Sequence, residues 1–348
     1  MDPKALYFGT VVWGQQYCNV FTNFCLPTLL SPRNIPAVAH RIPIVFSILT
    51  DVAGAAFFEI HPVIRKLREL ARVEILRLDR VSDTSALLTP EQRPTLSKRT
   101  LSASGQKALI KRAQESDAAF ALLCPDAIWS DGSFSRIVDL LEDGMRLISL
   151  PNPRLSWEGA TPLLGQARKD WVLTLPPRDL SMLALHALHW SGQAMFWDAP
   201  RFLRMPSHIY WRSANVGFVA HCFHVHPAVA YQTAEVIDIP GTLDDQFVEG
   251  FPDDRTYYVT DSDEACNFTF STQSEIGTQQ GNGAASIDEV VAWARERTNR
   301  RHRQFFGFPA FFHCDGLTTP AWKPVVEQAQ EVVSAIMAKL ALPQGDSA

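Results

Sequence analysis

The sequence lacks several patterns that would assign it to a common class of protein. No apolar run approaches the roughly 20 residues that a membrane span needs. Its 6 cysteines include no C-x-x-C pair, which argues against a zinc ribbon or a thioredoxin-type redox centre. The phosphate-loop, dinucleotide-binding, nucleophile-elbow and H-E-x-x-H signatures are also missing. ATPase, Rossmann dehydrogenase, α/β-hydrolase and metalloprotease functions therefore lose their usual support.

Neither sign of charge dominates the chain. Its 348 residues carry 32 Lys and Arg against 37 Asp and Glu, and a formal net charge of −5 argues against a dedicated nucleic-acid binder. A hydrophobic content of 46% is typical of a chain that buries a core. The first 14 residues hold one lysine and no apolar leader segment, so we expect a cytoplasmic protein with free thiols.

Strands and helices are predicted to alternate up to about residue 150. Apolar segments typical of buried strands lie at 6–14, 41–51, 73–79, 119–124 and 145–151. Segments with helical spacing lie at 15–31, 61–72, 102–116 and 134–144. This alternation predicts an α/β fold with a mostly parallel sheet flanked by helices on both faces. Ligands bind beyond the carboxyl ends of the strands in such sheets, which directs attention to the loops at 9–15, 50–54 and 124–133.

The alternation stops in the second half of the chain. We expect a division into an α/β half, 1–150, and a mixed α+β half, 151–348, within one continuous domain. The second half is predicted to contain an apolar strand at 218–231 and two long helices at 286–305 and 320–342.

Two acidic residues, Asp126 and Asp131, follow the fourth predicted strand in the segment LLCPDAIWSDGSF. Carboxylates at the end of a strand are well placed to hold a divalent cation against a diphosphate, because hard cations prefer oxygen ligands. The alternative is that both acids only shape turns through bonds to the backbone.

Four segments, GTVVWG, LPTLLSPRNIPA, IVFSILTD and LLCPDAIWSDGSF, together resemble a nucleotide-diphospho-sugar transferase with the GT-A fold. The resemblance covers the first 150 residues and implies a glycosyltransferase with a nucleotide-sugar donor and a glycan, lipid-linked or protein acceptor. A D-x-D motif in that family binds Mn²⁺ or Mg²⁺ on the diphosphate. The matching triplet here is Cys124-Pro125-Asp126, which keeps only the last acid.

The resemblance also implies roles for individual residues. Asp126 would face the metal and His226 would complete the metal shell, while Asp51 would lie near the base or ribose. Asp131 and Lys107 would support the diphosphate, although a surface lysine is an alternative for Lys107. The nucleotide site would be lined by the end of the first strand and its loop: Thr10, Val12, Trp13 and Gly14.

Three histidines interrupt the predicted strand at 218–231. His224 and His226 would face the same side of a strand and could bind one metal ion; the alternative is that they hydrogen-bond to the backbone. A metal-dependent hydrolase using His221, His224 and His226 is therefore an alternative function. A non-catalytic nucleotide-sugar-binding protein is another, because Cys124 departs from D-x-D.

The candidate catalytic base of an inverting transfer is Asp245, with Asp244 and Asp198 as further candidates. Asp244 and Asp245 could equally cap a short helix. Asp198 lies among aromatic residues that could stack on a sugar. The acidic segment TDSDEA, 260–265, lacks the loop spacing of an EF-hand, so a solvated turn is expected there.

The basic run at 295–303 favours a solvated helix end over contact with a leaving diphosphate or an anionic membrane surface. An apolar stripe on the last helix predicts docking on the domain or on a second subunit, with peripheral membrane contact as a weaker alternative.

Overall fold

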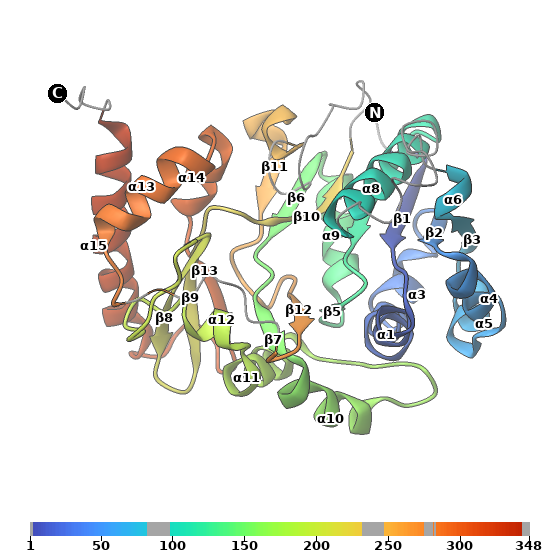
Figure 1. The fold of residues 1–348 in the computed structure, drawn as a ribbon, viewed down its shortest axis with the longest axis horizontal. Coiled ribbons are helices and arrows are strands. Elements are labelled where there is room, and N and C mark those ends of the chain that lie inside the picture. Colours follow the sequence, from blue (N-terminus) through green and yellow to red (C-terminus); the bar gives the residue numbers. More distant parts are fainter. Residues whose placement is uncertain (1–2, 82–97, 232–246, 275–280, 282, 343–348) are drawn as a thin grey trace. The chain divides into compact units, whose positions relative to one another are not determined.

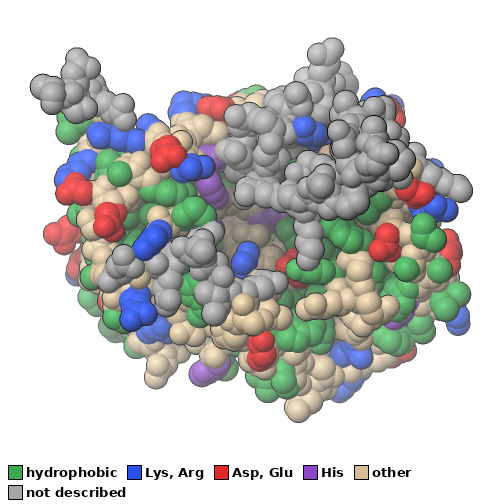
Figure 2. Space-filling view, viewed as in Figure 1, with side chains coloured by type: hydrophobic (Ala, Val, Ile, Leu, Met, Phe, Trp, Pro, Cys, Tyr) green, Lys and Arg blue, Asp and Glu red, His purple; other side chains and the backbone are tan. Residues whose placement is uncertain are grey.

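The computed structural model describes residues 3–81, 98–231, 247–274, 281 and 283–342. The chain forms two compact units, each built from several stretches of sequence. The first comprises 1–149, 163–175 and 226–257; the second comprises 150–162, 176–225 and 258–348. On the face drawn in Figure 2, basic and acidic side chains both occur across the described part of the surface.

The first unit is built on a large, mostly parallel sheet with the strand order β11-β6-β10-β4-β1-β2-β3 (Figure 1). Its strands are β1 (Ala5–Val11), β2 (Ile44–Thr50), β3 (Arg72–Arg77), β4 (Ala118–Leu123), β6 (Leu147–Leu150), β10 (His226–Ala230) and β11 (Thr256–Tyr258), with a short strand β5 (Ala127–Trp129) outside it. β1 runs parallel to both β2 and β4, and β2 runs parallel to β3, whereas β10 is antiparallel to β4. The prediction of an α/β unit with a mostly parallel sheet is therefore confirmed.

The helices of the first unit follow the strands closely in sequence. They are α1 (Gln15–Val20), a π-helical turn η1 (Phe21–Cys25), α2 (Leu26–Leu29), α3 (Ile35–Val38), α4 (Val52–Ile60), α5 (Pro62–Arg68), α6 (Leu78–Val81), α8 (Lys98–Glu115), α9 (Ser133–Glu142) and the 3₁₀ turns η3 (Phe247–Gly250) and η4 (Asp253–Arg255). Phe8 of β1 stacks on Phe46 of β2 and meets Phe134 of α9, so these rings form a core on one face of the sheet. Tyr7, the preceding residue of β1, accepts a hydrogen bond from Arg112 of α8 on the other face.

The sequence did not predict α4. The segment 52–60 is apolar almost throughout, so it lacks the contrast between faces that marks a helix in sequence. Its start is fixed by Asp51, whose Oδ1 accepts a hydrogen bond from the backbone N–H of Gly54 at 2.6 Å. The expected loop at 50–54 is therefore the cap and first turn of a helix.

The second unit combines small sheets with helices. Its elements are β7 (Arg154–Ser156), the start of α10 (Trp157–Ala167), α11 (Pro177–Ala187), α12 (Trp190–Gln193), β8 (His208–Ser213), β9 (Gly217–Cys222), β12 (Asn267–Ser271), α13 (Ile287–Arg297), α14 (Arg300–Phe306), β13 (Ala310–His313) and α15 (Trp322–Ala341). β9 pairs antiparallel with both β8 and β13, and β7 pairs parallel with β12. The apolar stripe of α15 packs in one core with β8, β9 and α13, which confirms docking of this helix on its own chain.

Two expected elements are divided in the structure. The predicted helix at 286–305 is α13 and α14, because Asn299 and His302 exchange hydrogen bonds with each other's backbone N–H and start a new helix. The predicted strand at 218–231 is β9 and β10, with a bend between them that contains His224. β9 belongs to the second unit and β10 to the first.

Candidate functional site

The carboxyl edge of the first unit's sheet contains a topological switch point. Strands β2 and β3 extend the sheet from one side of β1, while β4 continues it from the other side. In the register of β1 and β4, Thr10 is the partner of Leu123, so the loops after these strands leave the sheet next to each other. Ligands of open parallel sheets bind at this kind of position.

The loop after β1 is held to the neighbouring strand. The backbone N–H of Val12 donates to the carbonyl oxygen of Leu49 in β2 at 2.9 Å. The side chains of Thr10 and Val12 are buried, while Trp13 is half-buried and Gly14 is exposed. Of the four residues predicted for a nucleotide site, Trp13 and Gly14 are therefore the ones that a ligand could reach.

Asp126 and His226 lie at the end of β4. His226 opens the antiparallel strand β10, and its Nε2 donates to the carbonyl oxygen of Leu122 at 3.1 Å. Burial raises the pKa of the Cys25 thiol, and the nearby Asp126 carboxylate adds to this rise. The Cys25 Sγ in turn donates to the carbonyl oxygen of Cys124 at 3.6 Å. Because the Nε2 of His226 is directed at a carbonyl, a metal ion at this histidine would have to use Nδ1.

The remaining predicted residues of the first unit have structural partners or a different position. Asp51 caps α4, and the Oδ1 of Asp131 accepts the backbone N–H of Arg33 at 2.9 Å. Lys107 lies half-buried on α8.

Of the three predicted bases, the structure describes only Asp198. Asp198 is exposed in a turn of the second unit that follows α12. Asp244 and Asp245 lie outside the described residues.

His224 lies in the bend between β9 and β10, so the prediction that His224 and His226 share a strand face was wrong, and the alternative of hydrogen bonds to the backbone is confirmed. Each ring faces a backbone carbonyl: His221 that of Phe306, His224 that of Arg297 and His226 that of Leu122. His221 and His224 also belong to a different unit from His226. The structure therefore removes the histidine strand on which the hydrolase alternative depended.

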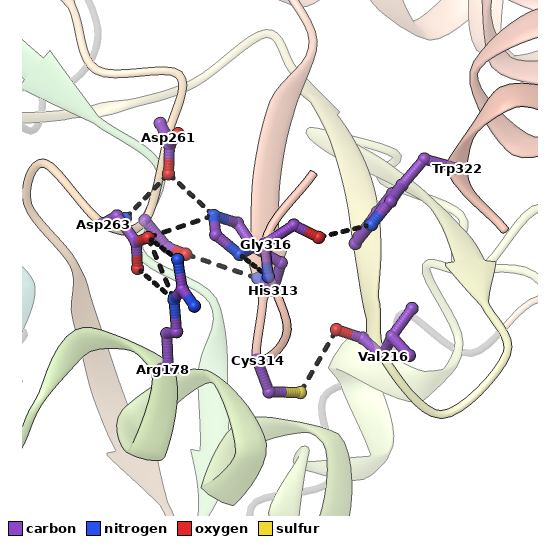
Figure 3. A network of polar contacts seen from close by, with 9 residues as sticks. Arg178, Val216, Asp261, Asp263, His313, Cys314, Gly316 and Trp322 are labelled. Atoms are coloured by element: carbon purple, nitrogen blue, oxygen red, sulfur yellow. Dashed lines mark hydrogen bonds and ion pairs between the residues drawn. The ribbon is translucent and has the colours of Figure 1, made fainter. Parts of the chain in front are cut away.

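A different group of side chains comes together in the second unit (Figure 3). Asp261 and Asp263 come from one turn and His313 from the end of β13, and one ligand atom of each lies within 4.8 Å of the others. His313 is buried, Asp261 is half-buried and Asp263 is exposed. Two carboxylates and an imidazole are a donor set used by divalent metals, so this group could hold a metal ion.

Hydrogen bonds already engage each of these three side chains. The backbone N–H of Gly316 donates to His313 Nδ1 at 3.1 Å, so the proton of the neutral ring lies on Nε2. This Nε2 donates to Asp261 Oδ1 at 2.9 Å, and the hydrogen bond holds the pKa of Asp261 below its ordinary value. An ion bound at Nε2 would therefore have to replace a proton.

Arg178 of α11 neutralises the other carboxylate. Its Nε and Nη2 donate to Asp263 Oδ2 at 3.0 and 2.8 Å, and this contact raises the pKa of Arg178. A metal ion at Asp263 would compete with this guanidinium (Figure 3).

The sequence pointed to only part of this group. The segment 260–265 forms a turn, as expected, and the D-x-D spacing of its acids was visible. His313 is 50 residues farther along the chain and had no local signal that connected it to the turn. A bridge between Asp261 and Phe311 of β13 brings His313 to the turn.

Comparisons with known proteins add no family to these observations. A scan against protein-family models gives no match, and a search of curated proteins gives none either.

Proposed function

We propose that the chain is a glycosyltransferase that uses a nucleotide-diphospho-sugar donor at the carboxyl edge of the first unit's sheet. The observation that carries the proposal is the switch point between β1 and β4, where the loops after both strands leave the sheet side by side. The GT-A fold is part of this proposal, as are the three acceptor classes: glycan, lipid-linked and protein.

The donor would bind with its base near Trp13 and its diphosphate near Asp126. The half-buried ring of Trp13 offers a stacking surface, and the open backbone at Gly14 lets a ligand approach closely. Trp13 lies in the loop after β1 and Asp126 in the loop after β4. Because these two strands pair in register, the spacing between the two contacts is fixed.

Mn²⁺ or Mg²⁺ fits this edge only in part. Asp126 supplies one carboxylate, Cys124 replaces the first acid of the D-x-D motif, and the Nε2 of His226 is committed to Leu122. The diphosphate would therefore have to supply most oxygen ligands of the ion. When bound, the ion would neutralise charge on the leaving diphosphate, while Asp126 would hold the ion in place.

Thermal melting with UDP, GDP, CDP and dTDP, each with and without Mn²⁺, tests the proposal. A ligand at 100 times its dissociation constant stabilises the folded state by about 2.7 kcal/mol, so one nucleotide is expected to raise the melting temperature by several degrees. Asp126→Asn should remove the part of the rise that depends on Mn²⁺. Asp143→Asn, an exposed acid of the same unit, is the matched control.

The outcome also separates the alternative functions. No rise with any nucleotide would refute the proposal. A rise that is insensitive to Mn²⁺, together with no release of nucleoside diphosphate from any sugar donor, would favour the non-catalytic binding protein.

A further inference from the structure

Helix α4 turns an apolar face to solvent. Val52 is 58% exposed and Ile60 is 78% exposed, and Ala53 and Ala56 lie exposed between them. Gly54 and Phe58, on the opposite side of the helix, are buried. A surface helix normally presents polar side chains outward, so an apolar outward face indicates a partner.

Aromatic rings and a cation continue this face beyond the end of α4. The ring of Phe57 contacts that of His61, with ring centroids 5.0 Å apart, and His61 contacts Trp171 at 4.9 Å. The guanidinium of Arg168 lies over the Trp171 ring, 4.9 Å from its centroid. We call this surface the α4 face. It consists of the exposed apolar residues of α4 and the side chains that continue from them: Val52, Ala53, Ala56, Phe57, Ile60, His61, Arg168 and Trp171.

The segments around the α4 face contain slightly more basic than acidic residues. The basic residues are Arg65, Lys66, Arg68, Arg168 and Lys169, and the acidic residues are Asp51, Glu59, Glu69 and Asp170. Glu59 is paired with Arg68 at 2.5 Å and Asp170 with Lys66 at 2.6 Å, whereas Asp51 before α4 and Glu69 after α5 form no ion pair among the described residues.

Two further cations flank the same elements. Arg65 of α5 and Lys169 are exposed, and neither forms an ion pair with any residue in the described part of the chain. At the lower right of Figure 2, where Figure 1 draws α4 and α5, hydrophobic, basic and acidic side chains lie next to each other. The face therefore combines exposed apolar side chains with a small surplus of positive charge.

We propose that the α4 face binds the surface of an anionic lipid bilayer. Exposed aliphatic side chains enter the interface between headgroups and acyl chains, while nearby Lys and Arg side chains are attracted to anionic lipids. A symmetric contact between two copies would bring the same cationic rim against itself, which disfavours a second copy as the occupant. Among the described residues, the structure contains no helix with the length and apolar character of a membrane span.

This surface bears on the acceptor of the proposed transfer. α4 begins directly after Asp51, at the carboxyl edge of the same sheet, so a bilayer at the α4 face favours a lipid-linked acceptor. That consequence rests on the proposed function. Binding to vesicles without any nucleotide tests the surface by itself, so failure of one proposal can be distinguished from failure of the other.

The test is co-sedimentation of the full chain with vesicles of phosphatidylcholine alone or mixed in equal parts with phosphatidylglycerol. Two pairs of substitutions probe the face: Val52→Ser with Ile60→Ser, and Arg65→Gln with Lys169→Gln. We expect binding to the anionic vesicles only. Removing the two cations should weaken it roughly thirtyfold, from the usual contribution of a cation at an anionic surface. The serine pair should weaken it at least roughly tenfold through lost apolar burial.

Matched controls come from the second unit. Leu342→Ser changes an apolar residue that is 62% exposed, and Lys323→Gln changes an exposed lysine. Both should bind vesicles as the unchanged chain does. Far-UV circular dichroism and melting temperature confirm that each variant is folded.

Three results would overturn the proposal. The first is no binding of the unchanged chain to either vesicle, and the second is binding that survives both pairs of substitutions. The third is a concentration-dependent dimer, detected by light scattering, that the serine pair abolishes, because the face would then belong to a second copy.

Discussion

Buried His221 should make the folded state sensitive to mild acid. It lies in β9 at 1% exposure, its Nδ1 donates to the carbonyl oxygen of Phe306 at 2.8 Å, and its ring packs edge-on against Trp211. Burial lowers the pKa of His221 from 6.5 to about 4, only partly offset by the hydrogen bond to Phe306. The ring is therefore neutral in the folded protein at pH values where the unfolded chain already binds a proton.

The magnitude follows from proton linkage. Between pH 6.5 and about 4 the unfolded state binds more protons than the folded state, so the free energy of unfolding falls as the pH falls. The contribution of neutral His221 to the free energy of unfolding is fully present above pH 6.5. At 1.36 kcal/mol for each pKa unit, it is about 2 kcal/mol smaller near pH 5 and about 3.4 kcal/mol smaller once the folded pKa is passed.

Urea unfolding of the unchanged chain and of His221→Asn, each at about pH 7.5 and about pH 5, measures this difference. The side-chain amide of asparagine can donate in place of Nδ1, but it does not titrate. The variant should be less stable than the unchanged chain at both pH values. Between about pH 7.5 and about pH 5, its free energy of unfolding should fall by about 2 kcal/mol less than that of the unchanged chain. His221→Leu should show the same flattened pH dependence. Equal pH dependence in all three proteins, or an imidazole NMR titration of His221 centred near 6.5, would refute the reasoning.

Three further substitutions test other contacts by their effect on unfolding or melting. Asp51→Ala should cost about 1 kcal/mol in urea unfolding by removing the cap of α4, whereas Asp51→Asn should be nearly neutral; equal losses would show that the cap is unimportant. Gly217→Ala should cost about 3 kcal/mol or more, because φ is +155° and a Cβ would lie 2.0 Å from the Phe312 carbonyl oxygen. The control Gly165→Ala meets no atom within 4 Å and should be mildly stabilising. Arg178→Gln should enlarge the rise in melting temperature that Zn²⁺ produces, since the guanidinium no longer competes for the Asp263 carboxylate. No response to Zn²⁺ in either protein would show that this group is only a hydrogen-bonded network.

The sequence by itself determined the parallel part of the first unit's sheet. The near-continuous apolar segments that became β1, β2 and β4 had to be buried on both faces, and helical spacing between them required parallel strands with crossover helices. The same alternation was sufficient to direct attention to the loops that carry Trp13 and Asp126. These are properties of local periodicity, which a single sequence contains.

Only the tertiary structure decided which distant residues meet. His313 joins Asp261 and Asp263 because Phe311 of β13 bridges to Asp261, and no local signal connects residues 50 positions apart. His221, His224 and His226 shared an apolar segment in the sequence, yet a bend divides it and each ring turns to a carbonyl of another element. Folding buries His221, which lowers its pKa, but it leaves the apolar side chains of Val52 and Ile60 on α4 exposed to solvent. Burial depends on the packing of the whole unit, and for that reason the sequence alone determines neither.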